Sequence, residues 1–161
     1  MPRLAACLIA ATFLAGCVPV PVPIPLPSGG GGGGPTAVTT LDSTGSADIN
    51  AYRREAGLAP LRRAPRLDAV ARGHAADMAR NGFFGHTGSN GSSNGARIRA
   101  AGFQPCGAAE NIAEGPFTVP GVLASWMGSA GHRRNMLNPR YTDYGLAEVG
   151  GKWVMTFAGR C

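Results

Sequence analysis

The chain has 161 residues, with 15 Lys and Arg against 9 Asp and Glu, and a formal net charge of +6. This length fits one domain with accessory segments, because single domains mostly run to about 100–150 residues. The arginines are scattered as singles and pairs, without a basic run or interleaved aromatic residues. The composition therefore does not indicate a nucleic-acid partner, and the positive balance favours anionic surfaces such as lipid headgroups or acidic wall polymers.

Residues 1–16 have the features of a signal peptide, with one charge at Arg3 and then an apolar run. The run is shorter than the about 20 residues of a membrane-spanning helix. It leads into Leu14-Ala15-Gly16-Cys17, which resembles a bacterial lipobox, whose cysteine becomes the lipid-modified first residue of the mature chain. We expect an exported lipoprotein, in the periplasm or at the cell surface, whose partner is a membrane reached through lipid on Cys17. An ordinary secretory signal is the alternative, and it also exports the chain.

Residues 17–45 form the expected tether. Alternating prolines from Pro19 to Pro27 favour polyproline II, a semi-rigid stalk on the order of 30 Å long. The glycine run from Gly29 to Gly34 then acts as a free joint. Such a tether holds a folded domain off a surface while letting it turn, although a merely disordered segment has the same composition.

The folded domain is expected over residues 46–161. Apolar spacing and capping residues predict a first helix that starts at Ser46 and stops at Gly57, followed by helices over 66–81, 96–101 and 119–127. A short buried strand is expected over 108–115, and two strands over 144–150 and 152–159 meet at Gly150-Gly151, a two-residue hairpin signal. Helices interrupted and followed by antiparallel strands predict a layered α/β (α+β) fold.

The cysteines allow one disulfide in this domain. Cys7 is lost with the leader and Cys17 would carry lipid, which leaves Cys106 and Cys161. Exported proteins fold where disulfides persist, so we expect these two residues to be bridged.

Three histidines are the candidates for chemistry. His74 falls on the apolar stripe of the helix expected over 66–81, so we interpret it as a satisfied structural residue. His86 lies in the polar, glycine-rich loop "FFGHTGSNGSSNG". His132 lies near the start of a short helix, a place where a histidine is more often a surface or capping residue.

Three segments in order, "FFGHT" around His86, "AENIAEG" around Glu110 and "SWMGSAGHRRNMLNPRYTDYG" around His132, resemble the CAP (SCP) domain of cysteine-rich secretory, antigen 5 and pathogenesis-related proteins in its bacterial form. The resemblance runs from about residue 48 to residue 157. It implies a three-layer α-β-α sandwich.

The resemblance also implies a ligand cleft with two histidines and two glutamates, able to hold a divalent metal in some members. His86 and Glu110 match the first histidine and one glutamate. The positions of the second glutamate and second histidine hold Ser129 and Arg140 instead. We expect His132 to occupy the vacated space, so that His86, Glu110 and His132 form the candidate cleft.

Two imidazoles and one carboxylate suffice for an open three-ligand site for a divalent metal such as zinc, or for a pH-sensitive hydrogen-bonded cluster. The chain has no His-Glu-x-x-His motif, which excludes a zincin protease, and no catalytic residue is assigned. The favoured function is binding of an envelope lipid, glycan or protein. The alternatives are a metal-dependent envelope hydrolase or protease, and a structural factor that spaces envelope layers.

Overall fold

The structure of the protein is a computed structural model that describes residues 46–161, with side chains from Ile49 onward. The predicted signal peptide, the lipidation site Cys17 and the tether lie outside the described residues. The elements in chain order are α1 (Ser46–Glu55), β1 (Arg62–Arg63), α2 (Pro65–Asn81), α3 (Asn94–Ala100), β2 (Pro105–Glu114), α4 (Val119–Gly128), α5 (Ala130–Met136), β3 (Asp143–Val149) and β4 (Lys152–Arg160).

The strands form one mixed sheet in the order β1-β3-β4-β2. Strand β4 is antiparallel to both β3 and β2, whereas the short β1 runs parallel to β3. The predicted hairpin between β3 and β4 is confirmed. Gly150 and Gly151 have φ angles of 59° and 78°, the positive values that a type I′ turn requires at both central positions.

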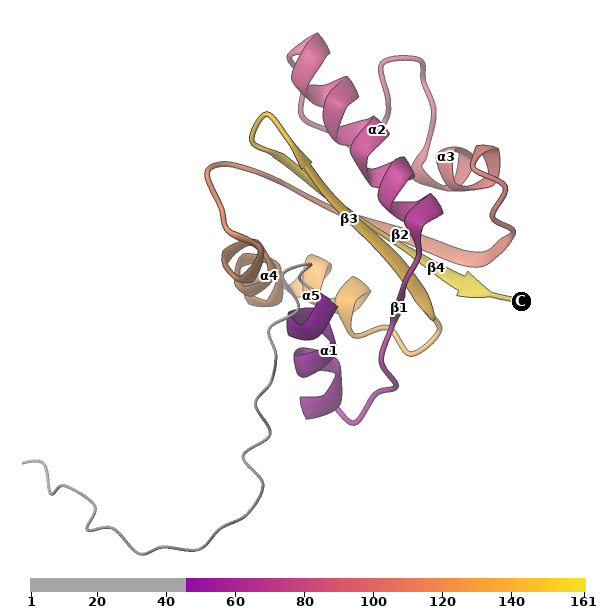
Figure 1. Cartoon of the computed structure of the whole chain (residues 1–161), viewed down its shortest axis with the longest axis vertical. Helices are drawn as coiled ribbons and strands as arrows, with labels where there is room; N and C mark the ends of the chain where they lie inside the picture. Colours follow the sequence, from indigo (N-terminus) through magenta and orange to yellow (C-terminus); the bar gives the residue numbers. More distant parts are fainter. Residues whose placement is uncertain (1–45) are drawn as a thin grey trace, which may run out of the picture. The chain divides into compact units, whose positions relative to one another are not determined.

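Helices cover both faces of the sheet. In Figure 1, α2 and α3 lie on one face, and α1, α4 and α5 lie on the other. Successive side chains of β4 point to opposite faces of the sheet. On one face, Trp153, Met155 and Phe157 belong to the core under α4 and α5. On the other face, Val154 and Ala158 pack with residues of α2. The three-layer α-β-α sandwich expected from the sequence is confirmed.

Helix α2 lies directly on β3 at Gly145. A Cβ atom at Gly145 would lie 2.1 Å from the backbone carbon of Leu67 and 2.3 Å from the backbone nitrogen of Asp68. Real Cβ atoms do not approach backbone this closely, so only glycine allows the contact. This close approach brings the buried side of α2, including His74, down onto the sheet.

The disulfide between Cys106 and Cys161 is present, with the two Cα atoms 4.9 Å apart. The pairing of β2 with β4 brings the cysteines together, because Pro105 lies opposite Arg160 at the ends of the two strands. The bridge thus fastens the end of the chain to the start of the edge strand β2.

The structure corrects several boundaries. Helix α3 begins at Asn94, two residues earlier than expected, because Ser93 accepts a capping hydrogen bond from the Ala96 backbone at 3.3 Å. Strand β2 starts at Pro105 rather than at residue 108, because its pairing with β4 continues to the chain end. Strand β1 was not expected, since two residues are too few to show a periodicity.

Candidate functional site

Glu110 is the centre of the candidate site. It lies on the edge strand β2 and is only 7% exposed. Its side chain faces the layer of α2 and α3, and its two carboxylate oxygens have separate partners. Oε1 accepts a hydrogen bond from His86 Nδ1 at 2.9 Å, and Oε2 accepts one from Arg97 Nη2 at 2.7 Å. The carboxylate is therefore held from two sides, by a loop and by α3.

His86 lies in the loop after α2, with its side chain 59% exposed. Because the Glu110 carboxylate can only accept, the His86 Nδ1 must carry the proton in this hydrogen bond. The Arg97 guanidinium also donates to the His86 carbonyl oxygen at 3.1 Å. Glu110 and Arg97 together fix the position of His86, and the bond to Glu110 leaves the Nε2 of His86 available to an incoming group. The predicted meeting of His86 with Glu110 is present in the structure.

His74 belongs to the same cluster, which the sequence interpretation did not foresee. It is buried at 1% exposure, as expected for a residue of the apolar stripe. Its Nε2 lies 2.8 Å from the Gly85 carbonyl oxygen and 3.8 Å from Glu110 Oε1. Its Nδ1, however, has no hydrogen-bond partner among the described residues, so His74 is structural but not fully satisfied.

Burial lowers the pKa of His74 below its usual value; the Glu110 carboxylate opposes the effect and the charge of Arg97 adds to it. A neutral His74 that faces a carbonyl oxygen through Nε2 carries its proton there.

Arg97 was not identified from the sequence as a residue of the site. It is 13 positions from Glu110 on another element, and no local pattern marks such a pairing.

His132 approaches β2 from the opposite layer. It lies on α5, and its carbonyl oxygen accepts a hydrogen bond from Asn111 Nδ2 at 3.1 Å. Asn111 and Glu110 are neighbours on β2, so their side chains point to opposite faces of the sheet. The His132 ring is half-buried near Trp126, with the ring centroids 6.4 Å apart.

Burial lowers the pKa of His132, and the charge of His86 lowers it further. Within residues 49–161, no hydrogen bond or ion pair joins the His132 ring to His86 or Glu110. The structure brings His86 and Glu110 into contact and places His132 nearby on the other side of the strand.

This arrangement does not fit the three-ligand zinc site that the sequence suggested. The described part of the chain contains no group of three His, Cys, Asp or Glu side chains that could hold a metal ion. Glu110 already accepts from a guanidinium and an imidazole, and the Nδ1 of His86 faces that carboxylate. A cation would have to displace Arg97 to reach Glu110.

Ser129 occupies the N-cap position of α5, but its side chain makes no capping hydrogen bond. Among the residues that the structure covers, no helix is both long and apolar enough to cross a membrane.

Two curated relatives from Bacillus subtilis (strain 168) match the sequence. "Uncharacterized protein YkwD" is 34% identical over 128 residues, which cover 78% of this chain and 50% of that protein. "Uncharacterized membrane protein YlbC" is 34% identical over 97 residues, or 60% of this chain and 28% of that protein. The chain therefore spans half the length, or less, of these relatives.

Solved structures match the fold. An extracellular protein containing an SCP domain from Bacillus anthracis gives a TM-score of 0.69 at 27% identity, over 73% of this chain and 40% of that one. An outer surface protein from Borrelia burgdorferi gives a TM-score of 0.65 at 21% identity, over 72% of this chain and 90% of that one. Both likenesses concern the fold of this chain.

The sequence pattern of the CAP family covers residues 47–157, which contain all three candidate residues and every strand as far as Phe157 of β4. The fold likeness to a protein that contains an SCP domain agrees with that match. The chain belongs to the CAP family, the cysteine-rich secretory protein family.

Proposed function

We propose that this protein is an exported lipoprotein, held at a membrane by lipid on Cys17, whose CAP domain binds a lipid, glycan or protein of the cell envelope through a surface formed by His86 and His132 beside Glu110. The family match and the extracellular neighbours support export. The lipobox-like Leu14-Ala15-Gly16-Cys17 supports the anchor.

The observation that carries the binding role is the hydrogen bond between Glu110 and His86. A buried carboxylate orients an exposed imidazole and leaves its Nε2 free to meet a ligand. Arg97 holds the second oxygen of the same carboxylate, so Glu110 is fixed in position while it orients the ring. The set is therefore suited to holding an imidazole in place for recognition.

The same hydrogen bond favours one alternative, an envelope hydrolase. A carboxylate that orients a histidine is the arrangement that activates a nucleophile in many hydrolases. Within residues 49–161, no serine, threonine or cysteine side chain is hydrogen-bonded to His86. The alternative therefore needs a water molecule as the nucleophile, with His86 as the general base.

The test is binding of the full-length protein to isolated envelope fragments, measured by co-sedimentation. We expect His86→Ala and His132→Ala each to lower the bound fraction, because both remove a recognition group at the surface. Arg72→Ala is the matched control, since Arg72 lies on the exposed side of α2. Equal binding by all variants would reject the site. Release of soluble fragments by the wild type, but not by His86→Ala, would favour the hydrolase.

A further inference from the structure

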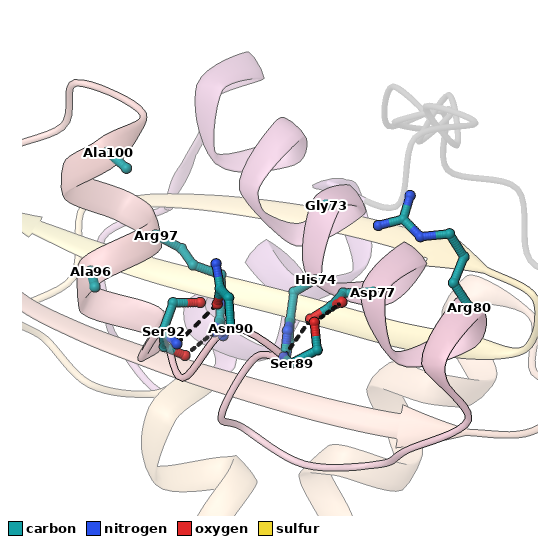
Figure 2. Close-up of a pocket in the computed structure, with 10 residues that line it drawn as sticks. All are labelled: Gly73, His74, Asp77, Arg80, Ser89, Asn90, Ser92, Ala96, Arg97 and Ala100. Carbon is teal, nitrogen blue, oxygen red and sulfur yellow. Dashed lines mark hydrogen bonds between the residues drawn. The ribbon is translucent and has the colours of Figure 1, made fainter.

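Two cavities beside α2 differ in how their charged side chains are used. The larger, of about 540 Å³, lies between α2 and α3 and is drawn in Figure 2. Its half-buried charged side chains are engaged by the protein itself, since Arg97 pairs with Glu110 and Asp77 accepts hydrogen bonds from Ser89. The smaller, of about 380 Å³, lies at the start of α2. Its lining includes four arginines and one aromatic side chain: Arg62, Arg63, Arg66, Arg160 and Phe103.

A buried carboxylate holds two of these arginines side by side. The Asp143 side chain is 0% exposed, and its Oδ1 accepts hydrogen bonds from Nε and Nη2 of Arg62 at 2.8 and 2.6 Å. Its Oδ2 accepts a hydrogen bond from Nε of Arg160 at 2.9 Å. Two guanidinium groups that repel each other are thus fixed on one carboxylate by charge-assisted hydrogen bonds.

The same two arginines remain open to solvent. The side chains of Arg62 and Arg160 are 61% and 57% exposed, and both line the cavity. The Nη1 group of each makes no hydrogen bond within residues 49–161. Because a guanidinium carries five N–H donors, each arginine can hold Asp143 and still donate to a ligand.

The cavity has an excess of positive charge. Asp143 offsets only one of the two arginines that it holds, and Asp68 pairs with Arg63 at 3.0 Å. Arg66 is exposed and forms no ion pair within the described part of the chain. Four arginines against two carboxylates leave two positive charges without a partner.

The arginines are held in place before any ligand arrives. The guanidinium carbon of Arg160 lies 5.9 Å from the centre of the Phe103 ring, which is a cation–π distance. The next residue, Cys161, is fastened to Cys106 by the disulfide. Binding therefore costs less ordering of side chains than it would at a mobile surface.

The charge and shape of the cavity select the ligand. A phosphate monoester carries about −1.5 to −2 charges near pH 7, which matches the excess, whereas a carboxylate carries one charge and a neutral sugar none. The planar fork of arginine also matches the oxygen atoms of a phosphate group.

We infer that the cavity at the start of α2 binds a phosphate monoester group, which accepts hydrogen bonds from Nη1 of Arg62 and of Arg160 and pairs with Arg66. Soluble phosphate esters and lipid headgroups both present this group. The site shares no residue with the His86 and His132 surface, so either can fail without the other.

The experiment is a calorimetric titration of the full-length chain carrying Cys17→Ser, which removes the proposed lipid, at fixed ionic strength. Glycerol 3-phosphate is the ligand, and glycerate is the matched carboxylate. We expect saturable binding of the phosphate and at least about tenfold weaker binding of glycerate. Equal affinity for the two compounds, or no saturable binding of glycerol 3-phosphate, overturns the inference.

Two variants localise the binding. Arg66→Ala should weaken it by about threefold without changing thermal unfolding, because Arg66 has no ion pair in the described residues to lose. Arg62→Lys keeps the charge beside Asp143 but removes the fork, so it should weaken binding by about tenfold. Arg54→Ala is the control, since Arg54 is an exposed arginine of α1, on the opposite face of the sheet from α2 (Figure 1). Unchanged affinity in both cavity variants, or an equal loss in Arg54→Ala, overturns the inference.

A vesicle arm identifies the source of the phosphate. The same Cys17→Ser chain is co-sedimented with phosphatidylcholine vesicles that contain or lack phosphatidic acid. Binding that requires phosphatidic acid and falls in Arg62→Lys assigns the site to a lipid headgroup. Saturable binding of glycerol 3-phosphate without such vesicle binding assigns it to a soluble ester.

Discussion

Arg97 of α3 and Glu110 of β2 form an ion pair across the layer boundary, with Arg97 Nη2 2.7 Å from Glu110 Oε2. Their side chains are only 13% and 3% exposed. The Glu110 carboxylate also accepts a hydrogen bond from His86, and the Arg97 guanidinium also donates to the backbone carbonyls of His86 and Ser92. One ion pair thus fixes α3, the loop and the edge strand around the candidate site.

Replacement of Glu110 by Gln should therefore destabilise the domain. The change leaves the charge of Arg97 without its partner in a mostly buried place, and we expect a loss of about 2–3 kcal/mol in the free energy of unfolding. Urea denaturation measures it. Glu114→Gln is the control, because Glu114 pairs with Lys152 but is 54% exposed, so its loss should change stability by less than about 1 kcal/mol. Equal losses in both variants would contradict the structural role of the buried pair.

Stability should also depend on pH. The pKa values of His74 and His132 are both lowered in the folded state, first of all by burial. The unfolded chain takes up these protons near pH 6.5 while the folded chain does not, so stability is full above that pH and falls as the pH drops below it. The comparison is the free energy of unfolding at pH 7.5 and at pH 5.

His74→Gln and His132→Gln should each flatten that pH dependence, since each removes one group with a lowered pKa. The measurements stop at pH 5 so that Asp77 does not contribute to the pH dependence. Its pKa is lowered by its hydrogen bonds to Ser89, so it takes up a proton only at lower pH. An unchanged slope in both variants would mean that other groups set the pH dependence.

Reduction of the disulfide between Cys106 and Cys161 should lower stability strongly. The bridge spans a sequence separation of 55 residues, for which chain entropy predicts about 4 kcal/mol, less any strain. Thermal unfolding with and without a reducing agent measures the effect, and the non-reduced mass should be about 2 Da below the dithiol value, because oxidation removes two hydrogens. Cys161→Ser should behave as the reduced protein does. Labelling of both thiols in the folded, exported protein would refute the bridge.

Gly145→Ala should be severely destabilising. The new methyl group would overlap the backbone of Leu67 and Asp68, so α2 would have to lift from β3, and we expect a loss of about 3 kcal/mol or more. Gly128→Ala is the matched control, because a Cβ atom there meets nothing within 4 Å. A small effect of Gly145→Ala in calorimetry would show that α2 can move away from the sheet without loss.

Cys17→Ser tests the anchor. Stable membrane attachment needs two acyl chains or an equivalent second signal, which a lipidated cysteine supplies and a serine does not. We expect the wild-type protein in the membrane fraction and the variant in the soluble exported fraction or left unprocessed. Membrane fractionation that is the same for both proteins would leave the ordinary secretory signal as the explanation.

Several features followed directly from the sequence, because they depend on local rules. The apolar stripe predicted α2 to within one residue, and Gly150-Gly151 predicted the hairpin of β3 and β4. The count of cysteines in the exported domain predicted the disulfide. The ordered segments around His86, Glu110 and His132 identified the family and with it the three-layer fold.

Tertiary structure decided what those residues do. Glu110 and Asn111 are adjacent, and the alternation of side chains along β2 sends Glu110 toward α2 and α3 and Asn111 toward α5, which separates Glu110 from His132. Only the packing of α3 over β2 shows that Arg97 neutralises Glu110, and only the close contact at Gly145 shows how His74 reaches the same carboxylate. Such pairings depend on the register and crossing of distant elements, which no local pattern of residues encodes.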